Sequence, residues 1–131
     1  MWLLDTNICS YILKHRPPSV LQRFSEVGAE HLATSTVVLG GLLFGCVRHP
    51  DGERIRREVE DFVSRLQIVP WDDAAARAYG DLRAHLERSG MPVGGMDLMI
   101  GAHALALAAT LVTNHVRHFE RMPGLQLENW V

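Results

Sequence analysis

The chain has 131 residues, 47% of them hydrophobic and 21% charged, with a formal net charge of −2. These values predict one globular domain with a substantial core and exclude a disordered or fibrous chain. The small net charge gives no general attraction for nucleic acid, so any such contact would have to use local basic clusters. The apolar start "MWLL" is interrupted by Asp5, which argues against a signal peptide or a membrane span. Cys9 and Cys46, with no secretory leader, indicate reduced thiols and a cytoplasmic location.

The first half of the chain alternates between strand and helix patterns. The run "WLLD" predicts a buried strand with Asp5 at its carboxyl end, so a strand-to-helix turn falls at Asp5 to Asn7. Pro17 and Pro18 break the helix that follows, and Ser19 is expected to cap the next one. The expected elements are strands at 2–5 and 31–35 and helices at 6–14, 19–27 and 36–45, the last capped by Ser35 or Thr36.

The second half continues the alternation. Apolar residues at steps of three and four predict an amphipathic helix at 51–66, and Gly90 closes another that begins at Asp72. Strands are expected at 67–71, 109–113 and 125–130, and a mostly apolar, buried helix at 96–108. Strands that alternate with helices predict a three-layer α/β domain, with a mainly parallel central sheet flanked by helices over residues 1–131.

Two carboxylates lie where such a sheet binds ligands, at the carboxyl ends of its strands. Asp5 ends the first strand, and Asp97 lies in the first turn of the buried helix. Each has a structural alternative. Asp5 could serve simply as the N-cap of its helix, and Asp97 could simply be a first-turn carboxylate that the helix dipole stabilises. Together they indicate a hard cation, Mg²⁺ or Mn²⁺, although phosphoryl-transfer sites usually gather three or four acids. The seven histidines show no metal-finger spacing; His115 and His118 are three apart, but two cysteines do not convincingly complete a structural zinc site with them.

Three segments resemble a known family over essentially the whole chain. "LLDTNICSYILK" at the start, "PVGGMDLMIGAHAL" at 92–105 and "LVTNHVRHFERMPGLQLENW" at 111–130 are similar to the PIN-domain toxins of the VapC type. The resemblance implies a PIN fold and a Mg²⁺-dependent endoribonuclease that cleaves cellular RNA. It also implies a cognate VapB-type antitoxin as partner.

The resemblance assigns roles to individual residues. Asp5 and Asp97 match metal-binding, catalytic acids of the family, and Thr6 and Asn7 match the polar pair after the first acid, which orients it and contacts substrate or water. Thr113 and Asn114 match a polar segment in which many relatives hold a further acid. Local basic residues could attract RNA, or could simply be solvated; the candidates are Arg117, Arg121 and the cluster Lys14, His15 and Arg16.

One position departs from the family pattern. A family segment of the form "TLAELLYG" aligns with "VVLGGLLFG" and places Gly41 where the second acid, a Glu, is expected. Loss of that acid would weaken cation binding and the orientation of the attacking water, so activity is expected to be weak or absent. The alternative is that Gly40 and Gly41 permit close helix packing while Asp5 and Asp97 alone hold the metal.

Two further interpretations follow from the sequence. The chain could be a catalytically inactive PIN-fold protein that dimerises and captures an antitoxin, and the apolar residues of 37–44 could form a homodimer face or an antitoxin groove. A flavodoxin-like domain that binds a small molecule is disfavoured, because no Gly-rich phosphate loop follows the first strand. No membrane partner is expected.

Overall fold

The computed structural model describes all residues, 1–131, and contains one five-stranded sheet. The strand order is β3-β2-β1-β4-β5, and every neighbouring pair is parallel. The strands are β1 (Trp2–Leu4), β2 (Leu32–Ser35), β3 (Gln67–Val69), β4 (Thr110–Val112) and β5 (Gln126–Glu128). The central strand β1 aligns Leu4 with Thr34 of β2 and with Val112 of β4, so these three strands end at the same level.

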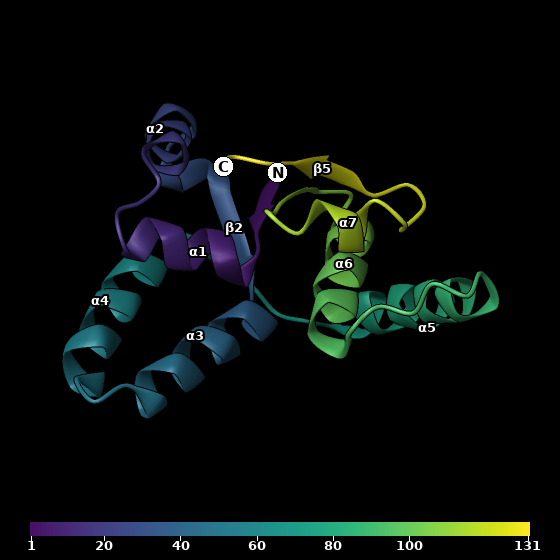
Figure 1. The fold of residues 1–131 in the computed structure, drawn as a ribbon, viewed down its shortest axis with the longest axis horizontal. Helices are drawn as coiled ribbons and strands as arrows, with labels where there is room; N and C mark the ends of the chain where they lie inside the picture. Colours follow the sequence, from purple (N-terminus) through teal and green to yellow (C-terminus); the bar gives the residue numbers. More distant parts are fainter.

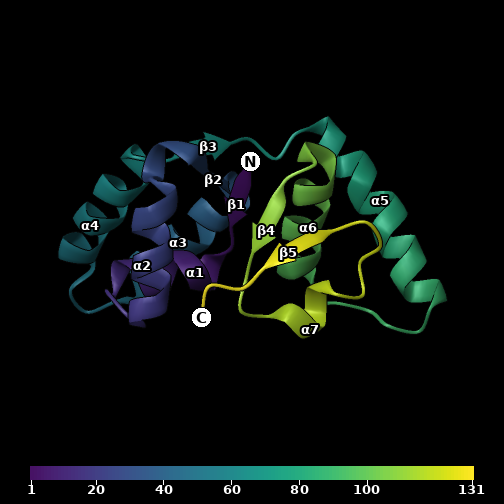
Figure 2. The ribbon, with the colours of Figure 1, turned by 90° about the horizontal axis from the view of Figure 1, so that it is seen from above.

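Seven α-helices cover the two faces of this sheet. They are α1 (Thr6–Leu13), α2 (Pro18–Val27), α3 (Thr36–Arg48), α4 (Gly52–Ser64), α5 (Asp73–Arg88), α6 (Gly95–Leu107) and the short α7 (Val116–Phe119). A single 3₁₀ turn, η1 (Ala29–His31), leads into β2. Helices α1 to α4 lie on one side of the sheet, and α5, α6 and α7 lie on the other (Figures 1 and 2). The predicted three-layer α/β fold with a parallel sheet is confirmed.

Side chains cap the starts of α1, α3 and α5, and one predicted cap needs correction. The Ser35 hydroxyl accepts a hydrogen bond from the backbone N–H of Val37 at 3.1 Å, so Ser35, rather than Thr36, caps α3. The prediction that Ser19 caps α2 is wrong, because the helix begins at Pro18 and its N-cap residue is Pro17. Proline suits the first helical turn, where its fixed φ is favourable and its missing N–H has no intrahelical partner to lose.

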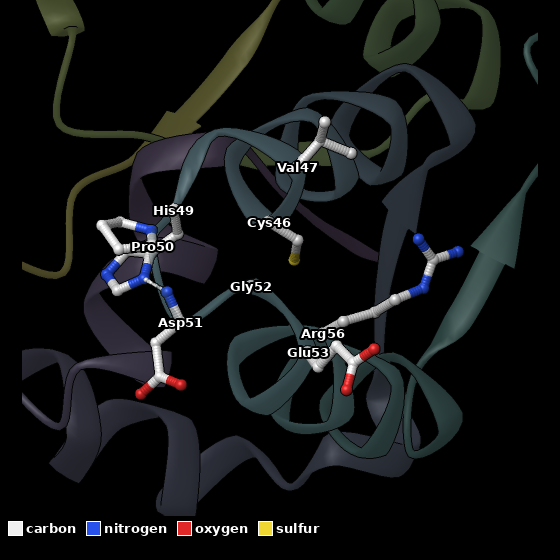
Figure 3. Close-up of a pocket in the computed structure, with 8 residues that line it drawn as sticks. All are labelled: Cys46, Val47, His49, Pro50, Asp51, Gly52, Glu53 and Arg56. Atoms are coloured by element: carbon white, nitrogen blue, oxygen red, sulfur yellow. Dashed lines mark hydrogen bonds between the residues drawn. The ribbon is translucent and has the colours of Figure 1, made fainter.

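The corner between α3 and α4 requires a glycine. A Cβ at Gly52 would clash with the backbone carbonyl oxygen of Cys46, so the first residue of α4 approaches the end of α3 too closely for any side chain. The same corner borders an open pocket of about 530 Å³, and Cys46, His49 and Arg56 are among the residues that line it (Figure 3). None of the predicted site residues lines this pocket.

The core is apolar and continuous through the central strands. Leu3 and Leu4 of β1 and Leu111 and Val112 of β4 are fully buried, as expected for strands covered on both faces. None of the helices combines the length and the apolar character that a membrane crossing requires.

Glu128 of β5 joins both ends of the chain to the helical layer. Its carboxylate accepts hydrogen bonds from Trp2 Nε1 at 3.2 Å, Trp130 Nε1 at 2.8 Å, and Arg23 Nη2 of α2 at 2.9 Å. The Arg23 guanidinium also lies over the Trp130 ring, 5.9 Å from its centroid. Burial alone would raise the pKa of Glu128, but the hydrogen bonds from Trp130, Trp2 and Arg23 together hold it below its usual value.

Glu128→Gln is expected to lower the free energy of unfolding by roughly 1–2 kcal/mol at neutral pH, because it removes the charge from a carboxylate with three donor side chains. A carboxyl whose pKa is lower in the folded state stabilises the protein above its ordinary pKa of 4.5, and this stabilisation is lost as the pH falls through the folded value. Urea unfolding of the wild type and of the Glu128→Gln variant, measured from neutral to strongly acidic pH, checks the prediction. An equal difference at neutral and strongly acidic pH would contradict it.

Candidate functional site

Asp5 is a buried carboxylate at the carboxyl end of β1. Its side chain is 3% exposed, and its Oδ1 accepts a hydrogen bond from the Ile8 backbone N–H at 2.9 Å, so it also caps α1. Burial raises the pKa of Asp5, hydrogen bonds from Thr113 and Ile8 and the nearby His115 lower it, and the nearby Asp97 raises it; the net direction is upward. Asp97 and His115 therefore lie close enough to act on Asp5 electrostatically.

Asp97 reaches the same edge of the sheet from the first turn of α6. The helix begins at Gly95, one residue earlier than the sequence pattern indicates. The Asp97 carboxylate Oδ2 lies 2.7 Å from Nδ1 of His118 and 3.8 Å from Nδ1 of His115. Its side chain is partly exposed, so solvent and ligands have access to it.

The loop after β4 connects the two aspartates. Nδ2 of Asn7, in α1, lies 2.8 Å from Nε2 of His115, whose other nitrogen faces Asp97. Thr113 is fully buried and its Oγ1 accepts from the His115 backbone N–H at 2.9 Å. The next residue, Asn114, donates from Nδ2 to the Tyr11 hydroxyl at 3.3 Å. Asn7 and His115 therefore link the first turn of α1, which follows Asp5, to Asp97 in α6.

Gly41 faces this site. A Cβ built on Gly41 would lie 3.7 Å from Cγ2 of Thr6 and 3.8 Å from Sδ of Met96, which are ordinary contact distances to the neighbours of the two aspartates. A Cβ on Gly40 would meet nothing within 4 Å. Within this chain, neither glycine is therefore required for close helix packing. The hydroxyl of Thr6 is buried and has no hydrogen-bond partner.

Two residues at this edge are not among the predicted site residues. The sequence relates His115 and His118 only to a zinc site with the cysteines, but Cys9 and Cys46 are buried and both imidazoles lie beside Asp97. Their spacing of three, directly after a strand at the sheet edge, is the signal that could have found them. Arg117 is exposed on α7 and makes no ion pair.

Comparisons with known proteins decide the family. Residues 2–125 match the PIN domain. The chain is 41% identical over 129 residues to the tRNA(fMet)-specific endonuclease VapC of Shigella flexneri, covering 98% of this chain and 97% of the relative. It is 37% identical over 131 residues to Ribonuclease VapC2 of Rickettsia felis, covering 99% of this chain and 98% of the relative. This chain belongs to the VapC family of PIN-domain proteins.

Solved structures of VapC-family complexes have the same fold. The structure of DNA-bound VapBC from Salmonella typhimurium superimposes with a TM-score of 0.94 at 38% identity, covering 99% of this chain and 98% of that chain. VapBC2 of Rickettsia felis, bound to a DNA fragment from its promoter, gives a TM-score of 0.92 at 36% identity with the same coverage. The resemblance drawn from the three sequence motifs is confirmed.

The residues at this edge fit a divalent cation, which PIN-domain nucleases generally use. The negative charge of Asp97 disfavours the ionised form of Asp5 and so raises its pKa. A bound cation would remove that repulsion, and carboxylate oxygens are the ligands that hard divalent ions prefer.

Asp5→Asn is expected to raise the free energy of unfolding at neutral pH when no divalent cation is present. Asparagine keeps the cap on α1 but removes a buried charge. A carboxyl whose pKa is raised on folding stabilises the folded chain while protonated, and that contribution is lost as the pH rises from the ordinary value of 3.8 through the folded value. Urea unfolding is measured in the presence of a chelator between about pH 4 and pH 7. The free energy of unfolding of the variant should exceed that of the wild type by an amount that increases with pH. A variant less stable than the wild type across this range would contradict the expectation.

Proposed function

We propose that this chain is the toxin of a VapBC-type toxin–antitoxin pair and that it cleaves cellular RNA with a divalent cation, Mg²⁺ or Mn²⁺, held by Asp5 and Asp97. The observation that carries the proposal is that Asp5 and Asp97 both lie at the carboxyl edge of the sheet, where Asn7, two residues after Asp5, contacts His115, which in turn lies 3.8 Å from Asp97. The names of the relatives support the reaction, since they are an endonuclease specific for tRNA(fMet) and a ribonuclease.

The chain's own residues hold the cation and the substrate. A bound divalent cation supplies charge neutralisation at the scissile phosphate and a more acidic water. Asp5 and Asp97 provide the ligand oxygens, while Thr6 and Asn7 orient the first acid and offer polar contacts at the mouth of the site.

The loop after β4 faces the RNA in this proposal. Thr113 and Asn114 fix its conformation through their hydrogen bonds, and the exposed Arg117 provides a positive charge for a phosphate. Arg117 forms no ion pair within the chain, so its guanidinium is free to bind a phosphate.

The partner is a VapB-type antitoxin, and the active form is a homodimer in the cytoplasm. Similar solved chains are complexes named VapBC, which supports the antitoxin. On α3, Phe44 is 60% exposed and Val47 is 77% exposed, which supports burial of this apolar surface against another chain. Both cysteines are free and buried, in keeping with a reducing compartment.

RNA cleavage by the wild type and by variants of each aspartate tests the proposed function. With tRNA(fMet) as substrate and Mg²⁺ or Mn²⁺ present, Asp5→Asn and Asp97→Asn should each reduce kcat/KM on the order of a hundredfold or more, because each removes a cation ligand. His85→Asn, an exposed change on α5, is the matched control and should keep full activity. Cleavage that survives loss of either aspartate would overturn the proposal.

Gly41 supports a second candidate function, an inactive PIN-fold protein that binds the antitoxin without turning over RNA. Position 41 faces the site with room for a Cβ atom, and no carboxylate is present there. The two functions differ in one measurable property, which is cleavage of RNA in the presence of a divalent cation.

Gly41→Glu is expected to increase kcat/KM for RNA cleavage by about a hundredfold, because it adds a third carboxylate beside Asp5 and Asp97. Gly40→Glu is the matched control, since residue 40 belongs to the same helix and a Cβ there meets no other group. It should leave activity unchanged. Equal activity of the wild type and the Gly41→Glu variant would show that an acid at this position is not needed.

A further inference from the structure

Two imidazoles and one carboxylate converge at the carboxyl edge of the sheet. Asp97, His115 and His118 each offer one ligand atom, and the three atoms lie within 4.8 Å of one another. The two histidine rings are 5.4 Å apart between centroids, one at the start of α7 and the other within it. Both Nδ1 atoms are directed at the same carboxylate oxygen, Oδ2 of Asp97.

The separations suit a small metal ion. Tetrahedral zinc–nitrogen and zinc–oxygen bonds of about 2.0–2.2 Å place neighbouring ligand atoms roughly 3.4 Å apart. The distances from Asp97 Oδ2 to the two Nδ1 atoms, 2.7 Å and 3.8 Å, lie on either side of this value. Small side-chain rotations at an exposed site would therefore bring all three atoms to one ion.

The surroundings also orient His115 as a metal ligand would be oriented. Its Nε2 is 2.8 Å from the side-chain amide of Asn7. The Asn7 amide nitrogen faces Nε2 and fixes the ring with Nδ1 toward Asp97, and a half-turn of the amide would present its oxygen to an Nε2–H and leave the lone pair of Nδ1 for a metal ion. A hydrogen bond to the far ring nitrogen is the usual support of a metal-binding histidine.

A simple ion pair explains less of this arrangement. One histidine beside Asp97 would suffice for an ion pair or a hydrogen bond, and His118 at 2.7 Å is close enough to provide it. A second imidazole aimed at the same oxygen, and held from behind by Asn7, adds a donor that the ion pair does not need.

We infer that Asp97, His115 and His118 form a site for a first-row transition-metal ion of the Co²⁺-to-Zn²⁺ class. Imidazole nitrogen suits these ions, whereas Mg²⁺ prefers oxygen ligands and keeps several waters. Two histidines and one carboxylate on one side of an ion leave its remaining positions open to water or to a phosphate oxygen. The inference shares Asp97 with the proposed function, but it depends on neither Asp5 nor RNA cleavage.

The test is a calorimetric titration of the chelator-treated, untagged 131-residue protein with Zn²⁺, Co²⁺ and Mg²⁺ in separate runs. The wild type should bind one Zn²⁺ or Co²⁺ at least tenfold more tightly than Mg²⁺. Co²⁺ should also show visible ligand-field absorption that reports nitrogen ligation. The double variant His115→Asn, His118→Asn should lose on the order of a hundredfold in Co²⁺ affinity and change its absorption spectrum.

The control double variant, His31→Asn and His85→Asn, changes two exposed histidines on other elements and should bind Co²⁺ as the wild type does. Co²⁺ binding no tighter than Mg²⁺ binding, or equal Co²⁺ affinity in the wild type and the His115, His118 variant, would overturn the inference. Asp5→Asn separates the two proposals, because it should abolish Mg²⁺-dependent RNA cleavage and retain the Co²⁺ spectrum. A wild type that binds Co²⁺ through the two histidines but cleaves no RNA would support this site and refute the proposed function.

Discussion

The fold holds a negative charge where water is almost excluded, at the end of its central strand. Asp5 is 3% exposed and receives hydrogen bonds from Ile8 and Thr113, yet the balance still raises its pKa. Burying a carboxylate costs free energy unless donors or an opposite charge compensate. The protein compensates this charge only in part, and Asp97 adds a second negative charge nearby. What remains uncompensated is what a cation would supply.

The rest of the structure keeps these charges together. Parallel pairing of β1 with β4 ends both strands at one level, so Asp5 and Thr113 are neighbours by register. Asp5 is also the N-cap of α1, so the bond to Ile8 that fixes its carboxylate also starts the helix that carries Asn7. At the outer strand, Glu128 ties both chain ends to α2 and so supports the edge of the sheet. Stability and site geometry therefore depend on the same few contacts.

Sequence patterns predict the layers well and the local details less well. Apolar runs give all five strands, and an Asp at a strand end together with an Asp in the first turn of a buried helix predicts where the site lies. The start of α2 was missed because a proline at the first turn competes with a serine cap, and the sequence does not show which one prevails. The sequence does not place the two imidazoles beside Asp97, because their positions depend on the turn before α7. That helix has four residues and is too short to be predicted from periodicity.

Gly41 and the two histidines affect the same property, which is the negative charge around the proposed metal site. A hard cation is favoured by a cluster of carboxylates, and position 41 contributes none although a Cβ atom would fit there. Neutral imidazole adds a donor without adding negative charge, so His115 and His118 can strengthen a metal site around Asp97 without increasing its repulsion with Asp5. A site with fewer acids and more nitrogen donors shifts preference from Mg²⁺ toward softer ions. In the proposed site, the choice of metal would follow from this chain's own side chains, on a fold that the chain shares with its family.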